Sequence, residues 1–235
     1  MNSQPPNPEP ASTSSNEDDV RRLHGEGFHV FPTSKDKKPK GKWRNGPVDY
    51  VEVAPTLEEL ETWLRRRQKP PGWILLCGGP KRLVPIDVEA AGVNDPGPKG
   101  DRIREVVAEF PHTCKRPSPS GGLHVWLACT DADAPDGKGC KLVTRVDDLE
   151  EREVTLLAEY RGHGQYALIL GHGRGELPAD WAPHPVTREE LDGIFDRLRE
   201  VSDTLPAAKA KQKAREVGSD WTADGVRDWE RNPPT

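Results

Sequence analysis

The apolar residues of this chain fall into short runs, and this feature constrains its fold more than any other. Runs such as 73–79, 83–89 and 121–129 are bounded by glycine, proline or charged residues, which is typical of β-strands. None approaches the roughly 20 apolar residues that a membrane-spanning helix requires. The pattern therefore predicts several short strands and no membrane-spanning segment.

Helices are predicted between these strands, where leucines recur at helical spacing or a capping signal is present. Thr56 and Glu59 form one capping box, and Thr187 and Glu190 form another. In such a box the two side chains satisfy backbone N–H groups at the start of a helix. The predicted helices are 17–25, 56–67, 101–110 (with Asp101 as its cap) and 187–201.

Two glycine-containing turns predict β-hairpins. Gly-Gly-Pro-Lys-Arg would join strands 73–79 and 83–89, and Gly-His-Gly would join strands 154–162 and 165–173. Residues 130–149 are expected to form a long polar connection. With the helices, this pattern predicts an α+β fold, whose core is a mostly antiparallel or mixed sheet flanked by helices.

Familiar nucleotide-binding signatures are absent from the chain. It contains neither G-x-G-x-x-G nor G-x-x-x-x-G-K-[ST], and its strands do not alternate strictly with helices as in doubly wound folds. These absences exclude the usual dinucleotide-binding site and a P-loop ATPase or helicase module.

Composition divides the chain into three parts. Only 33% of its 235 residues are hydrophobic and 24 are proline, so part of the length is expected to lie outside a packed core. We expect residues 1–16 to be a disordered tail, 17–203 one folded domain, and 204–235 a loosely attached helical and basic tail. The N-terminus lacks the basic and apolar regions of a secretory signal, which predicts a cytoplasmic protein.

Cysteine spacing gives no sign of a metal site. No two cysteines form a C-x-x-C pair, so we expect free structural thiols rather than disulfides or a zinc site completed by a histidine. The cysteines and the two histidines considered for such a site are Cys77, Cys114, Cys129, Cys140, His112 and His163.

Charge is distributed unevenly along the chain. The net charge of −5 argues against a protein that coats nucleic acid with its whole surface. Residues 21–50, however, carry eight lysines and arginines against three acidic residues. Such a segment suits phosphate binding at one place, and it suits an ordinary solvated surface equally well.

Two carboxylates end the predicted strand 83–89. Asp87 and Glu89 are separated by one residue, so their side chains project from the same face of the strand. Side-by-side carboxylates repel each other unless a cation lies between them, and Mg²⁺ prefers such oxygen ligands. The alternative is a strand that simply runs out into a solvated turn.

A serine- and glycine-rich turn opens the next predicted strand. Ser120 is followed by Gly121 and Gly122, whose backbone can approach a ligand closely and offer N–H groups to an anion. His124 then begins the strand. It is a candidate ligand-binding residue, and the alternative is a core histidine with satisfied hydrogen bonds.

A third acid lies within an otherwise apolar strand. Glu159 needs a partner or a metal in such a position. Arg161 stands two residues further on and projects to the same side, so an ion pair within the sheet is the alternative to a metal ligand.

In this order, the three motifs resemble the bifunctional primase–polymerase branch of the archaeo-eukaryotic primase superfamily. The segment Gly-Phe-His-Val-Phe-Pro at 27–32, followed by Lys-Lys-Pro and Trp43, is also similar to the start of that family's domain. The resemblance covers roughly residues 20–175. It implies a primase-like, RRM-like sheet fold and a catalytic domain over 17–203. The loop at 171–176, Gly-His-Gly-Arg-Gly-Glu, differs from the family's usual Pro-Pro-Ser-like turn.

The resemblance also implies an activity and a set of site residues. The activity is that of a DNA primase and polymerase, a nucleotidyltransferase that uses two Mg²⁺ or Mn²⁺ ions. Asp87, Glu89 and Glu159 would be the metal ligands and would be catalytic together with His124. The nucleotide would be bound by Ser120, Gly121, Gly122, His124 and Arg161, with Lys38 as a helper.

Partners and alternatives follow from the same resemblance. The expected partners are a single-stranded DNA template and primer, dNTPs or NTPs, and a separately encoded helicase as a further candidate, in plasmid or phage replication. One alternative is a catalytically impaired replication module that only binds nucleic acid, and another is a metal-dependent nuclease. His124 with its Ser-Gly-Gly turn favours the polymerase, because a nucleoside triphosphate needs phosphate-binding groups and simple hydrolysis does not.

Overall fold

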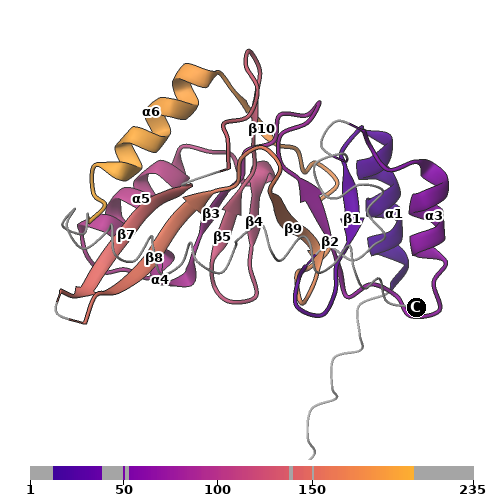
Figure 1. The fold of residues 1–235 in the computed structure, drawn as a ribbon, viewed down its shortest axis with the longest axis horizontal. Helices are drawn as coiled ribbons and strands as arrows, with labels where there is room; N and C mark the ends of the chain where they lie inside the picture. Colours follow the sequence, from indigo (N-terminus) through magenta and orange to yellow (C-terminus); the bar gives the residue numbers. More distant parts are fainter. Residues whose placement is uncertain (1–12, 39–49, 51–52, 138–139, 150, 204–235) are drawn as a thin grey trace, which may run out of the picture.

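The computed structural model describes residues 13–38, 50, 53–137, 140–149 and 151–203. Within this part, five helices accompany mostly antiparallel strands (Figure 1), which confirms the predicted α+β class. The helices are α1 (Thr13–Gly25), α3 (Leu57–Leu64), α4 (Ala90–Val93), α5 (Pro98–Ala108) and α6 (Arg188–Arg199). The strands are β1 (Val30–Pro32), β2 (Gly72–Leu76), β3 (Ile86–Val88), β4 (Lys115–Pro117), β5 (Leu123–Val125), β6 (Leu127–Cys129), β7 (Lys141–Asp148), β8 (Glu153–Tyr160), β9 (Tyr166–Gly171) and β10 (His184–Val186).

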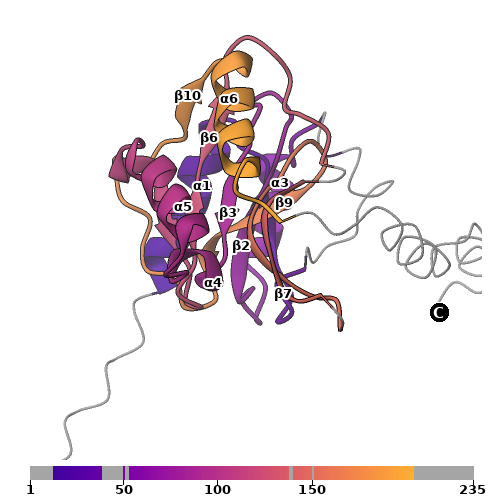
Figure 2. The ribbon, with the colours of Figure 1, turned by 90° about the vertical axis from the view of Figure 1, so that its left-hand side faces the viewer.

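The larger sheet has the strand order β4-β5-β3-β8-β7, and all its neighbouring strands are antiparallel. Apolar residues on alternate positions of these strands pack with α5 and α6 in one core. Figure 2 shows α4, α5 and α6 gathered on one side of the strands. The opposite face of this sheet is therefore left for polar side chains.

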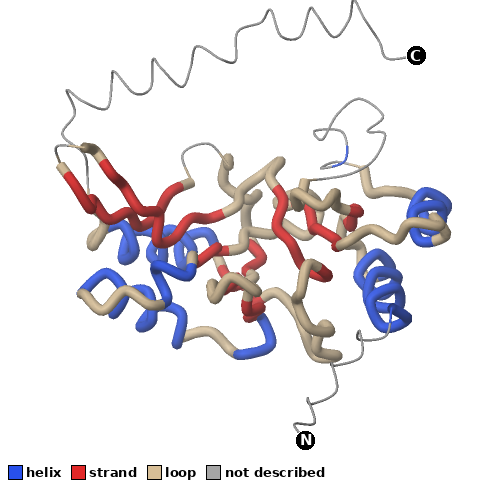
Figure 3. Tube along the Cα trace, turned by 90° about the horizontal axis from the view of Figure 1, so that it is seen from below, coloured by secondary structure: helices blue, strands red, loops and turns tan. Residues whose placement is uncertain are grey.

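A smaller sheet, β1-β2-β9, is also antiparallel and forms a second apolar core with α1 and α3. Seen from below, α1 and α3 lie at one end of the molecule and the helices of the larger sheet at the other, with strands between them (Figure 3). Strands β6 and β10 form a separate parallel pair. No helix in the described ranges is long and apolar enough to span a membrane.

Both predicted hairpins are wrong. Strands β2 and β3 belong to different sheets, and the turn between them makes only the isolated bridge Gly78–Leu83. Strands β8 and β9 are likewise separated, because β8 pairs with β3 and β7. Strand β7 lies within the segment 130–149, which was predicted as a polar connection. It is an edge strand whose outer half is partly exposed, so it lacks the apolar pattern by which strands are recognised.

The capping boxes are confirmed at Thr56 and Glu59 for α3 and at Thr187 and Glu190 for α6. The predicted cap of helix α5 is wrong: its N-cap is Gly97, four residues before Asp101, and Asp101 lies in the first turn. Helix α1 begins at Thr13, inside the stretch expected to be disordered. Outside the described residues lie the remainder of that stretch, residues 39–49 of the basic segment 21–50, and the tail at 204–235.

Candidate active site

Three carboxylates converge on the polar face of the larger sheet. Asp87 stands in the middle of β3, opposite His124 of β5 on one side and Glu159 of β8 on the other. Glu89 directly follows β3 and is the N-cap residue of α4. Carboxylate oxygens of the three acids lie within 4.8 Å of one another. The structure thus brings together the three acids that the sequence analysis nominated as metal ligands.

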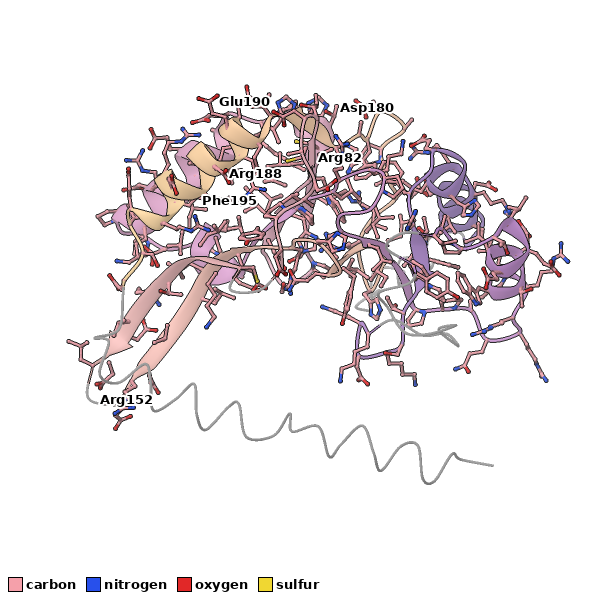
Figure 4. The ribbon with its side chains drawn as sticks, turned by 45° about the horizontal axis from the view of Figure 1, so that its top comes forward. Arg82, Arg152, Asp180, Arg188, Glu190 and Phe195 are labelled. Atoms are coloured by element: carbon pink, nitrogen blue, oxygen red, sulfur yellow. The ribbon has the colours of Figure 1, made fainter. Side chains whose placement is uncertain are left out.

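Alternation along the strands explains why these acids share one face. Both neighbours of Asp87 on β3 belong to the apolar core beneath the sheet, so Asp87 points to the other side. On β8, Tyr160 stacks on Phe195 of α6, with ring centroids 4.5 Å apart; Phe195 is labelled in Figure 4. This packing turns the preceding residue, Glu159, toward the acid cluster.

Arg161 bridges two of the three acids. Its Nη2 lies 3.1 Å from Oδ2 of Asp87 and also contacts Oε1 of Glu159. The ion pair that was the structural alternative for Glu159 is therefore present, and it lies inside the acid cluster rather than replacing it. The cation reduces the repulsion between two carboxylates whose side chains are only 16% and 12% exposed.

Burial and neighbouring charges move the pKa values of the acids in opposite directions. Burial raises the pKa of Asp87, but the hydrogen bond with His124 and the charge of Arg161 outweigh it and bring the pKa to about 2. For Glu89, burial is the largest cause and the negative charges of Asp87 and Glu159 add to it, so its pKa is raised. Ionisation is thus strongly favoured at Asp87 and disfavoured at Glu89.

The donor set fits a hard divalent cation. Carboxylate oxygens are the ligands that Mg²⁺ and Mn²⁺ prefer. Three such groups at this spacing repel one another: the charges of Asp87 and Glu159 add to burial in raising the pKa of Glu89. A divalent cation would relieve that repulsion. Asp87, Glu89 and Glu159 could therefore hold such an ion.

The turn before β5 presents hydroxyl groups rather than backbone amides. The amide of Gly121 donates to the carbonyl oxygen of Ser118 at 3.0 Å, and the amide of Gly122 donates to Ser118 Oγ at 3.0 Å. Both amides proposed for phosphate binding are thus engaged within the turn. Ser118 Oγ and Ser120 Oγ lie 2.7 Å apart, and both residues line the cleft described below.

Gly122 is required by a close approach of two chain segments. A Cβ at this position would lie 2.5 Å from the carbonyl oxygen of Val88 on β3, closer than such contacts occur. Gly121 adopts a φ of 88°, which favours glycine. The two glycines therefore hold the serine turn tightly against the end of β3, beside the acids.

His124 is buried, at 6% exposure, between an acid and an arginine. Its Nε2 lies 3.2 Å from Asp87 Oδ1, and Arg174 Nη2 lies 3.1 Å from its Nε2 and 3.3 Å from its Nδ1. Burial lowers the pKa of His124 despite the nearby carboxylate. Because Asp87 is ionised and Arg174 only donates, the consistent arrangement is a neutral ring with Nε2–H donating to Asp87 and Nδ1 accepting from Arg174.

Asp87 and Glu89 open into a cleft of about 560 Å³ between the two sheets. Strand β9 lines one side of it, and the loop after β1 adds Lys37 and Lys38. Lys38 was expected near the nucleotide, whereas Lys37 was overlooked. Lys37 has a φ of 60°, and its positive charge acts to lower the pKa of Glu89, so the loop brings cationic groups toward the acids.

The main residue that the motifs missed is Arg174, which lines the cleft from the turn after β9. The only signal was the unusual loop sequence at 171–176, whose glycines permit the sharp turn that carries this arginine inward. Ser118 was also missed, although it stands two residues before the nominated Ser120.

A comparison with curated proteins gives no match. The family model described as bifunctional DNA primase/polymerase, N-terminal, matches residues 21–203. The matched range contains the acid cluster, the serine turn, His124 and both sides of the cleft, and it confirms the resemblance drawn from the motifs. Since it spans well over half of the chain, the protein belongs to the bifunctional DNA primase/polymerase family and carries its N-terminal domain.

Proposed function

We propose that this protein synthesises or extends primers on a single-stranded DNA template, by nucleotidyl transfer from dNTPs or NTPs. The observation that carries this proposal is the convergence of three carboxylates suited to divalent cations, two of which, Asp87 and Glu89, line one cleft with hydroxyl and cationic groups suited to phosphates. Membership of the primase/polymerase family supports the binding of DNA and nucleotides.

Asp87, Glu89 and Glu159 would hold two Mg²⁺ or Mn²⁺ ions. Bound there, the ions would supply Lewis-acid activation of the attacking hydroxyl and neutralise charge on the triphosphate. Asp87 is suited to this role because its pKa of about 2 keeps it ionised at neutral pH. Arg161, in contact with two of the acids, is placed to turn from them to the phosphates.

Other groups of the cleft would hold the nucleotide. Ser120 and Lys38 would meet phosphate oxygens directly, while Gly121 and Gly122 shape the turn that presents the serine. His124 would contact the phosphates from the floor of the cleft and orient Asp87. Because phosphoryl transfer develops charge without covalent help from the protein, positioning and electrostatics of this kind supply most of the catalysis.

The test is extension of a primer annealed to a longer single-stranded DNA template, with dNTPs and either Mn²⁺ or Mg²⁺. The wild type is compared with the double variant Asp87→Ala/Glu89→Ala. A matched control, Asp101→Ala/Glu105→Ala, removes the same two types of acid from exposed positions on α5. Omission of the primer then tests whether synthesis starts de novo.

Extension by the wild type and the control, with a loss of several decades of rate in the double variant, would support the proposal; each tenfold corresponds to ~1.4 kcal/mol of barrier. Template binding without extension would point to the non-catalytic replication module. Metal-dependent shortening of the primer would point to a nuclease.

A further inference from the structure

The cleft has an acidic side and a basic side, which the strand order sets apart. Along one row of the larger sheet, Glu159 on β8 and Asp87 on β3 are followed by His124 on β5 and Arg116 on β4. Arg174 joins the basic side from the turn after β9 and lines the cleft together with Asp87 and Glu89. If one end of an elongated anion bound to metal cations at the acids, its other end would therefore lie near the positive charges at β5.

Arg174 is a buried cation that forms no ion pair with a carboxylate of the described residues. It is 9% exposed, and its Nη1 donates to the carbonyl oxygens of Pro117 at 2.8 Å and Arg116 at 3.3 Å. Its Nη2 faces His124, and its Nε has no hydrogen-bond partner. Within the described residues, no carboxylate lies at ion-pair distance from this guanidinium.

A second buried cation increases the local excess of positive charge. Arg116 is 5% exposed, and within the described part of the chain it donates only to backbone oxygens, those of Gly175 and Glu176 at 2.7 Å each and that of Ile169 at 3.4 Å. Burial and the charge of Arg116 lower the pKa of Arg174 to about 10, which still leaves it cationic at neutral pH. Buried charges that lack a counter-ion are costly, and a bound anion would offset that cost.

The backbone holds Arg174 firmly in this position. Three successive residues before it, Gly171, His172 and Gly173, have φ values of 76°, 51° and 82°. A Cβ at Gly171 would lie 2.3 Å from the carbonyl oxygen of Pro71, and one at Gly173 would contact Pro119 of the serine turn at 3.4 Å. The turn that carries the arginine and the turn that carries the serines are therefore packed together at one end of the cleft.

We propose that Arg174 binds the terminal phosphates of the incoming nucleoside triphosphate. The triphosphate would lie across the sheet, with its reacting end at Asp87 and Glu159 and its distal end over β5, near Arg174 and Ser118. This inference rests on the proposed function and adds to it the direction in which the nucleotide lies and the residue that recognises its distal end.

The test measures binding of dATP, dADP and dAMP to the protein in Mg²⁺ without primer or template, by calorimetry. The variant Arg174→Met removes the charge. The control Arg104→Met removes an arginine of α5 that also donates to backbone carbonyl oxygens, those of Val93 and Asp95, away from the cleft. The variant Arg174→Lys retains the charge on a buried side chain and serves if the methionine variant does not fold.

Loss of charge-assisted hydrogen bonds should weaken dATP binding by about 10- to 100-fold, with dAMP binding changed by less than about twofold. The lysine variant should show a smaller loss with the same selectivity for the triphosphate. Equal losses for all three nucleotides, or no loss, would overturn the inference. If dATP binding is lost selectively but the wild type does not extend primers, the role of Arg174 is supported and the polymerase function is refuted. If the wild type extends primers normally but the variant shows no selective loss of dATP binding, the polymerase function is supported and the role of Arg174 is refuted.

Discussion

Asp87 and His124 are cross-strand partners on β3 and β5, and Oδ1 of the acid lies 3.2 Å from Nε2 of the imidazole. The same acid faces Glu159 and contacts Arg161. One strand position thus links the acidic side of the cleft to its basic side, and the ionisation of Asp87 affects both the stability of the domain and its candidate metal site.

Stability should fall at low pH because of this acid. The pKa of Asp87 drops from 3.8 to about 2 in the folded state, so its contribution is present above pH 3.8 and is lost as the pH falls toward 2. The contribution is about 2–3 kcal/mol. Urea unfolding of the wild type and Asp87→Asn between pH 5 and pH 2 should show a steeper loss in the wild type. Parallel pH profiles would contradict the assignment.

Glu89→Gln should raise the free energy of unfolding at neutral pH. Burial and the two neighbouring acids raise the pKa of Glu89, so its ionised form destabilises the folded state. This destabilisation disappears as the pH falls through the raised pKa and the carboxylate becomes protonated. Urea unfolding at pH 7 and pH 4 measures the difference, with exposed Glu105→Gln as the control. A variant that is less stable at pH 7 would show that Glu89 has a stabilising partner instead.

Arg161→Met should strengthen Mn²⁺ binding in the absence of nucleotide. Its guanidinium contacts Asp87 and Glu159. A positive charge at that distance opposes the binding of Mn²⁺ to the same carboxylates. The same change should weaken dATP binding, because a phosphate contact is lost. Manganese titration followed by electron paramagnetic resonance measures the first effect, and unchanged or weaker Mn²⁺ affinity would count against a metal at these carboxylates.

Gly122→Ala should destabilise the domain by about 1–3 kcal/mol, because the added methyl group meets the carbonyl oxygen of Val88 at 2.5 Å. The control is Gly193→Ala on α6, where a Cβ meets nothing within 4 Å and alanine should stabilise the helix by up to about 1 kcal/mol. Thermal unfolding distinguishes them. Equal melting temperatures for the two variants would mean that the serine turn is not held against β3.

Local signals in the sequence predicted local structure well. Two capping boxes marked the starts of α3 and α6, and the strand alternation around Asp87 placed it on one face with the following acid. His124 and Glu159 could be nominated from their motifs and the family resemblance. Their pairing with Asp87 in adjacent strands is a property of the sheet order, which no single segment contains.

The failures have a common physical cause in long-range pairing. A turn such as that after β2 looks like a hairpin from its residues, yet β3 pairs instead with β5 and β8. Arg174 was missed for the same reason: it approaches His124 across 50 positions of sequence. Only the packing of two turns against each other brings it into the cleft.

Whether the three carboxylates form a catalytic metal site is best tested by single-nucleotide addition with simultaneous measurement of pyrophosphate release, in the wild type and in Glu159→Gln. We expect one pyrophosphate for each templated nucleotide that the wild type adds in Mn²⁺ or Mg²⁺, and a rate several powers of ten lower in the variant. Addition that persists in Glu159→Gln at the wild-type rate would contradict the claim that the three carboxylates form the catalytic metal site.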